Sequence, residues 1–229
     1  MTAALQAIDF DFDGVIADSE PLHFRAFQET LAEAGLDLSA DDYYAHYLGF
    51  DDVGLFRELT IDRQIAMNEG QITALVARKG AKLHKILHEG HALFPGAVHF
   101  IRRAAAEVPI AIASGALRHE IVEVIEAAGV GGLFAAIVAA GDTPLSKPSP
   151  APYRLAFERL RDSTGRDLDP RRCVAIEDSR WGLESACGAG LRCVAVTSSY
   201  SADQLPGAEL VVRGLDELTL PALHRLCAG

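Results

Sequence analysis

Short apolar runs alternate along the chain with segments of helical periodicity. Apolar residues recur at spacings of three and four in segments 97–108, 121–128 and 153–160, which predicts helices with one buried face. Because parallel strands need crossover connections, this alternation predicts an α/β fold with a doubly wound parallel sheet covered by helices on both sides. Six apolar runs have the length of buried strands: Leu5–Phe10, Ile110–Ala113, Ala136–Ala140, Cys173–Ile176, Cys193–Val196 and Leu210–Val212.

The interval between the first two predicted strands is too long for a single crossover. One helix, predicted over Gly96–Glu107, is enough for that connection, whereas the stretch from 18 to 90 holds several helical patterns and no convincing strand. We therefore predict a core domain over residues 1–17 and 91–229 and an inserted helical domain over residues 18–90. An insertion directly after the first strand is expected over the carboxyl edge of the sheet, where open α/β sheets bind ligands.

Composition and charge narrow the possible partners. The 229 residues hold 21 Lys and Arg against 32 Asp and Glu, a net charge of −11 that repels nucleic acids and anionic membrane surfaces. No run approaches the roughly 20 apolar residues of a membrane span, and the first residues lack a basic signal segment. The four cysteines form no C-x-x-C pair. We expect a cytoplasmic protein with no nucleic-acid or membrane partner.

Chemically active residues follow four of the predicted strands, at the point where each strand ends. In chain order they are Asp11 and Asp13, Ser114 and Gly115, Lys147, and Glu177 and Asp178. The carboxyl ends of parallel strands share one edge of a sheet, so we expect these residues to meet there. Each short motif alone is typical of a turn or a helix cap. Their joint occurrence in this order favours a catalytic site.

The acidic and basic members of this set suggest complementary roles. Up to four carboxylates, from Asp11, Asp13, Glu177 and Asp178, cannot all stay ionised together without a counter-charge, and Mg²⁺ with its preference for oxygen ligands supplies one. Lys147, the Ser114 hydroxyl and the backbone at Gly115 together would bind a phosphoryl group. A carboxylate beside such a group can act as a nucleophile, and a second carboxylate two residues further on can act as general acid and then base.

These motifs resemble those of the haloacid dehalogenase superfamily. The run Phe10–Glu20, FDFDGVIADSE, is similar to its first motif, in the subgroup of β-phosphoglucomutase, phosphoglycolate phosphatase and small sugar-phosphate phosphatases. Ser114, Lys147 and Glu177-Asp178 resemble the second, third and fourth motifs. The resemblance covers almost the whole chain and implies a Rossmann-like core with a helical cap of the C1 type.

The resemblance implies a role for each carboxylate. Asp11 would be the nucleophile that forms a phosphoaspartyl intermediate and would also bind Mg²⁺. Asp13 would protonate the leaving oxygen, later activate water, and bind Mg²⁺ through its main-chain carbonyl. Asp178 would bind the metal, and Glu177 would assist directly or through water.

Other implied roles concern phosphate and substrate. Ser114, Gly115 and Lys147 would hold the phosphate, and the 18–90 insertion would be the cap that closes over substrate and excludes water. His23 and Lys79 match cap positions that β-phosphoglucomutase uses to close over its substrate.

The acid at Asp13 favours phosphoryl transfer, because the dehalogenases and phosphonatases of the superfamily lack it. The cap arginine that grips a second phosphate in β-phosphoglucomutase is replaced within 48–52 (LGFDD), where Asp51 and Asp52 would repel such a phosphate, although Arg57 lies nearby. We predict a Mg²⁺-dependent phosphatase acting on a small phosphorylated metabolite such as a sugar phosphate. A phosphosugar mutase is the alternative within the family.

A signalling receiver module is the alternative from another class of protein. Receivers share the doubly wound fold and carry acids, a hydroxyl and a lysine at strand ends. They accept phosphate on a different strand, and they have no inserted cap.

Two residues depart from what their positions predict. Asp9 stands in the first strand where the family has an apolar residue, and a buried carboxylate needs either a partner or a raised pKa. We expect a local pairing rather than a catalytic role for it. Trp181, the only tryptophan, is expected to pack in the core.

Overall fold

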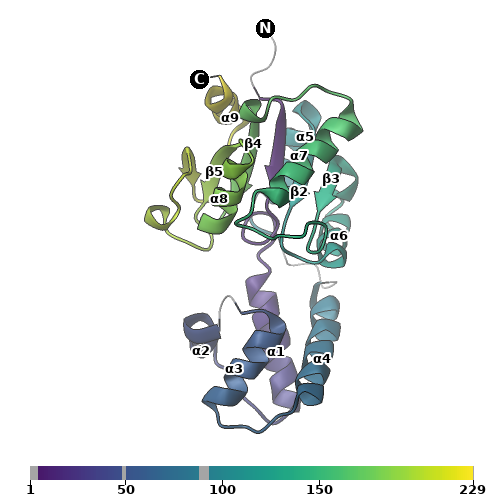
Figure 1. Ribbon diagram of the computed structural model, residues 1–229, viewed down its shortest axis with the longest axis vertical. Helices are drawn as coiled ribbons and strands as arrows, with labels where there is room; N and C mark the ends of the chain where they lie inside the picture. Colours follow the sequence, from purple (N-terminus) through teal and green to yellow (C-terminus); the bar gives the residue numbers. More distant parts are fainter. Residues whose placement is uncertain (1–4, 48–49, 88–92, 229) are drawn as a thin grey trace. The chain divides into compact units, whose positions relative to one another are not determined.

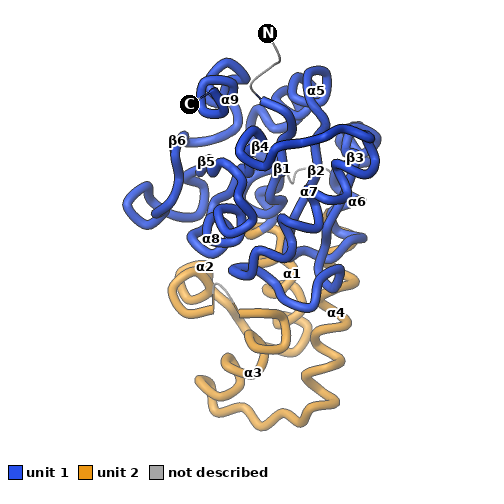
Figure 2. Tube along the Cα trace, turned by 45° about the horizontal axis from the view of Figure 1, so that its top comes forward, with its two compact units in different colours: residues 1–19, 92–229 blue, residues 20–91 orange. Residues whose placement is uncertain are grey.

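The computed structural model describes residues 5–47, 50–87 and 93–228. The chain divides into two compact units, shown in blue and orange in Figure 2. The first, which we call the core unit, comprises residues 1–19 and 92–229, and the second, the helical unit, comprises residues 20–91. The helical unit is therefore an insertion into the chain of the core unit.

A six-stranded parallel sheet forms the centre of the core unit (Figure 1). Its strand order is β3-β2-β1-β4-β5-β6, which confirms the predicted doubly wound α/β fold. The predicted strands agree with the observed ones to within two residues at each end. The strands are β1 (Ala7–Phe10), β2 (Ile110–Ala113), β3 (Phe134–Val138), β4 (Cys173–Glu177), β5 (Arg192–Val196) and β6 (Leu210–Val212).

Helices pack on both faces of this sheet. Alternation along β1 sends Phe10 toward α5, whose Phe100 ring lies edge-on at 6.1 Å, whereas Ala7 joins the cluster that α7 and α8 cover on the other face. None of the helices within the described ranges is long and apolar enough to cross a membrane. The core-unit helices are α5 (Ala97–Glu107), α6 (Arg118–Ala127), α7 (Ala151–Thr164), α8 (Arg180–Gly188) and α9 (Leu220–Cys227), with 3₁₀ turns η2 (Gly131–Leu133), η3 (Pro170–Arg172) and η4 (Ala202–Gln204).

The helical unit has its own apolar core. Phe27 of α1, Phe56 of α3 and Leu75 of α4 are buried in one cluster, and the rings of Phe27 and Phe56 pack edge to face with centroids 5.3 Å apart. Its described residues contain helices and no strand. The elements are α1 (Glu20–Glu33), α2 (Ala40–Asp42), the π-helical turn η1 (Tyr43–Tyr47), α3 (Asp52–Asp62) and α4 (Glu69–Leu87).

Asp9 in β1 has no hydrogen-bond partner among the described residues. It is fully buried, and its register neighbours on the flanking strands are Ala111 and Ala175, which offer no side-chain donor. The expected local pairing is therefore wrong. Burial raises the pKa of this carboxyl to about 8, so Asp9 is held in the sheet as a neutral acid near neutral pH.

Trp181 does not pack in the core, contrary to expectation. Its side chain is 41% exposed, stacks with the Arg180 guanidinium at 4.4 Å and meets the Tyr200 ring edge-on. In α8 the buried face carries Gly182, Leu183 and Ala186, so a residue one position before Gly182 is turned about 100° away from the sheet. Aromatic character alone predicted the wrong side of this helix.

Candidate active site

Three carboxylates meet at the carboxyl edge of the sheet, and we call Asp11, Glu177 and Asp178 the acidic cluster. Asp11 directly follows β1, Glu177 ends β4 and Asp178 comes next, and each offers an oxygen within 4.8 Å of the others. The two strands are neighbours, and the Asp11 N–H donates to the carbonyl of Ile176 at 2.9 Å. Parallel pairing of β1 with β4 therefore brings together acids that lie 166 positions apart in the sequence.

Lys147 bridges two members of the acidic cluster. Its ammonium lies 2.8 Å from Asp11 Oδ1 and 2.6 Å from Glu177 Oε1, and it sits 5.0 Å from the centre of the Tyr153 ring. Burial alone would lower the pKa of this lysine, but the charges of Asp11 and Glu177 outweigh burial and raise it. The structure thus holds a permanent positive charge against the Asp11 carboxylate.

Glu177 has both carboxylate oxygens occupied by protein donors. Oε1 accepts hydrogen bonds from Lys147 at 2.6 Å and from the Tyr153 hydroxyl at 2.8 Å. Oε2 accepts from the backbone N–H groups of Asp178 and Ser179 and from the Ser179 hydroxyl. These contacts use the available lone pairs, so Glu177 is arranged to fix Lys147 and the start of α8. A Cβ at Gly182 would lie 1.9 Å from its carboxylate carbon, so glycine is required there.

Asp13, Ser114 and Gly115 also lie at or beside this edge. Asp13 is half-buried in the turn after β1 and accepts a hydrogen bond from the Ser19 hydroxyl. Its side chain is not part of the acidic cluster, and the role implied for it at a metal uses the main-chain carbonyl. Ser114 is buried just after β2, whereas Gly115 is exposed with open space around its Cα. The backbone there is accessible to a ligand.

The acidic cluster fits a divalent cation. Burial, and after it the charge of Glu177, raises the pKa of Asp11 against the opposing effect of Lys147, and the same two causes raise the pKa of Asp178 to about 6. One lysine does not neutralise three carboxylates. With Glu177 occupied by protein donors, Asp11 and Asp178 remain as two hard oxygen ligands, the number of carboxylates that Mg²⁺ commonly takes.

His23 and Lys79 form a second cluster, within the helical unit. The Lys79 side chain is almost fully buried, and its ammonium lies 3.0 Å from His23 Nδ1, 2.7 Å from Asp52 Oδ1 and 4.6 Å from the centre of the Phe27 ring. Burial, and then the charge of Lys79, lowers the pKa of His23 to about 3. His23 is therefore neutral at physiological pH, and Asp52 is the counter-charge of Lys79.

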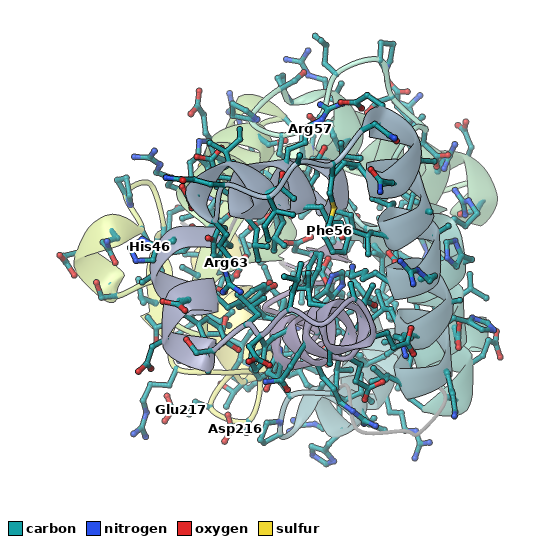
Figure 3. All side chains as sticks on the ribbon, turned by 90° about the horizontal axis from the view of Figure 1, so that it is seen from below. His46, Phe56, Arg57, Arg63, Asp216 and Glu217 are labelled. Carbon is teal, nitrogen blue, oxygen red and sulfur yellow. The ribbon has the colours of Figure 1, made fainter. Side chains whose placement is uncertain are left out.

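Arg57, the nearby arginine considered for gripping a second phosphate, already has an acidic partner. It projects from α3 (labelled in Figure 3), and its guanidinium lies 2.6 Å from Glu69 Oε2 in an exposed ion pair. Leu48 and Gly49 of the segment in which the family arginine is replaced lie outside the described residues.

The structure also shows site residues that the sequence reasoning missed. The Ser199 hydroxyl donates to Asp178 Oδ2, and the Ser198 hydroxyl donates to the carbonyl of Gly14. β5 ends at Val196, and the two serines follow it two and three residues later, so the rule applied to the other strands, polar residues just beyond a strand, could have found them. Tyr153 lies in the apolar stripe of α7, and nothing in the sequence marks its hydroxyl as a partner of Glu177.

Comparison with known proteins places the chain in a family. Residues 5–190 match the haloacid dehalogenase-like hydrolase family. Protein CbbY of Rhodobacter capsulatus is 33% identical over 97% of this chain and 99% of its own length. Hexitol phosphatase B of Escherichia coli K12 is 28% identical over 92% of each chain. A solved structure of a CbbY variant from Rhodobacter sphaeroides in complex with xylulose-(1,5)bisphosphate has 29% identity and a TM-score of 0.78, covering 96% of this chain and 99% of that one.

The chain therefore belongs to the haloacid dehalogenase-like hydrolases. It is an enzyme of that family, which confirms the resemblance seen in its motifs and excludes the receiver-module alternative.

Proposed function

We propose that this protein is a Mg²⁺-dependent phosphatase that hydrolyses a small phosphorylated metabolite, a sugar phosphate or a similar monoester, through a phosphoaspartate on Asp11. The observation that carries the proposal is the Lys147 ammonium set between Asp11 and Glu177, with Asp178 beside them. The names of the relatives support the substrate class, because one is a hexitol phosphatase and another was solved with a sugar bisphosphate.

In the first half of the proposed reaction, an Asp11 oxygen attacks phosphorus and the bond from phosphorus to the ester oxygen breaks. Asp13 donates a proton to the departing oxygen, so an alcohol leaves. Lys147 and Ser114 hold the phosphoryl oxygens, and Gly115 leaves the backbone open to them. Asp11, Asp178 and the main-chain carbonyl of Asp13 would hold Mg²⁺, which when bound would supply the positive charge that lets an anionic nucleophile approach an anionic ester.

In the second half, water attacks the phosphorus of the phosphoaspartate. Asp13 is now a carboxylate and accepts the proton of that water, and the bond between phosphorus and the Asp11 oxygen breaks. Inorganic phosphate leaves, and Asp11 returns to its starting state. Glu177 takes no part in bond making; it holds Lys147 in place through the 2.6 Å contact.

The helical insertion, residues 18–90, is proposed to be the C1-type cap over the core of residues 1–17 and 91–229, with His23 and Lys79 contacting substrate. Two cations of the helical unit that could bind a second phosphate already have acidic partners. Lys79 already has Asp52 as its counter-charge at 2.7 Å, and Arg57 is paired with Glu69. Both cations are already balanced by acids, so neither is available to grip the second phosphate that a mutase must bind, and a phosphosugar mutase is the weaker alternative.

A screen of phosphorylated metabolites tests this function. We expect release of inorganic phosphate from simple sugar monophosphates in the presence of Mg²⁺, and loss of that release when EDTA removes the metal. Mg²⁺ at 100 times its dissociation constant should also stabilise the folded protein by about 2.7 kcal/mol, visible as a rise in Tm. Isomerisation of β-glucose 1-phosphate without phosphate release would instead identify a mutase, and EDTA-resistant hydrolysis would contradict the metal site.

A further inference from the structure

We infer that Ser199 is a positioning residue for Asp178, so that the loop after β5 sets the affinity of the site for its metal. This inference rests on the proposed function, because it assigns Asp178 to a Mg²⁺ site. Ser199 belongs to none of the family motifs quoted above, and it reaches the acidic cluster from a strand that contributes no other residue to it.

The first step is the contact itself. The Ser199 hydroxyl donates to Oδ2 of Asp178, a side chain that is only 7% exposed. A hydrogen bond to an ionised acceptor in a buried setting is about twice as strong as a neutral one. It therefore fixes the rotation of the Asp178 carboxylate and leaves its other oxygen to a cation.

The second step is that Oδ2 is confined on its other side. Gly14 has φ of +76°, in the turn after β1, and a Cβ built on it would lie 2.0 Å from Asp178 Oδ2 and 3.0 Å from Ser199 Oγ. The carboxylate oxygen is thus enclosed between the backbone of that turn and the Ser199 hydroxyl. The Gly14 backbone cannot be displaced without moving the turn that carries Asp13.

The third step is that the loop carrying Ser199 is itself anchored. Thr197 N–H donates to the carbonyl of Val212 on β6 at 3.0 Å, and the Ser198 hydroxyl donates to the Gly14 carbonyl. Beyond Ser199, the Ser201 hydroxyl donates to Gln204 Oε1 at 2.9 Å. A donor on an anchored loop costs little ordering entropy when an ion binds, which is what a preorganised metal site requires.

Isothermal titration of the full chain with Mg²⁺ tests this inference. Removing an outer hydrogen bond of a metal ligand typically weakens metal binding by about 10- to 100-fold. We expect Ser199→Ala to raise the Mg²⁺ dissociation constant by that factor, with kcat at saturating Mg²⁺ changed far less. Ser199→Thr keeps the hydroxyl and should restore most of the affinity.

The matched control is Ser201→Ala, a change on the same loop. The Ser201 hydroxyl donates to Gln204 and not to Asp178, so this variant should bind Mg²⁺ like the unaltered protein. Unfolding measured without Mg²⁺ checks that Ser199→Ala is folded. Ser199→Ala with unchanged affinity, or Ser201→Ala with an equal loss, would overturn the assignment of Ser199 alone. An unaltered protein that binds no Mg²⁺ and releases no phosphate would overturn the proposed function with it.

Discussion

Replacing Asp11 with asparagine is expected to abolish hydrolysis of p-nitrophenyl phosphate, with a loss of roughly 10⁴-fold or more in kcat/KM. The amide has nearly the shape of the carboxylate but no negative charge, so it neither attacks phosphorus nor pairs with Lys147, which lies 2.8 Å from Asp11 Oδ1. Steady-state kinetics at saturating Mg²⁺ measures the effect.

Asp9→Asn is the matched control, because it makes the same chemical change two residues earlier, within β1. Asp9 makes no hydrogen bond to the residues of the acidic cluster, so the turnover of the Asp9→Asn variant should be nearly unchanged. An Asp11→Asn variant that keeps more than about a hundredth of the activity would remove Asp11 from the role of nucleophile. An equal loss in both variants would point to general damage of β1.

The second large effect concerns stability, and it depends on Asp9 itself. In the folded protein, burial raises the pKa of this carboxyl from 3.8 to about 8, whereas in the unfolded chain it ionises at its ordinary value. Between about pH 4 and pH 8, folding must therefore take up a proton. The contribution of Asp9 to stability is complete below pH 4 and is lost as the pH rises to about 8.

Asp9→Asn removes this ionisation. At pH 8 and above, the free energy of unfolding of this variant should therefore exceed that of the unaltered protein by about 5 kcal/mol. The other titratable groups around Asp9, Tyr153 and Cys173, have pKa values raised by burial and stay neutral through this range. Urea unfolding of both proteins from pH 4 to pH 9 measures the difference. Two parallel curves would show that Asp9 is solvated or paired and would contradict the structure.

Much of the fold could be predicted because its signals are local. The apolar runs at Ile110–Ala113 and Leu210–Val212 match β2 and β6 residue for residue. For β2 the reason is burial on both faces, which leaves no polar alternation to obscure the ends of the strand. The length of the interval after β1 also implied an insertion. The acids at 11, 177 and 178 meet because parallel strands align their carboxyl ends, which follows from the fold class alone.

What failed depended on three-dimensional neighbours. No sequence rule indicates that the residues flanking Asp9 across the sheet are alanines. The lack of a hydrogen-bond partner for Asp9 therefore could not be predicted. The exposure of Trp181 depends on which face of α8 meets the sheet. Ser199 reaches Asp178 from 21 positions away in sequence, through a side chain that on its own signals only a turn.

The stereochemical course of hydrolysis at phosphorus tests the central claim most directly, that the phosphoryl group passes through a carboxylate of the enzyme. Each in-line transfer inverts the configuration at phosphorus, so transfer to Asp11 and then to water gives overall retention. With a phosphorothioate monoester made chiral by two oxygen isotopes and hydrolysed in water of the third, we predict retention in the released thiophosphate. Inversion would mean a single direct attack by water, and it would contradict the phosphoaspartate account however active the protein proved to be.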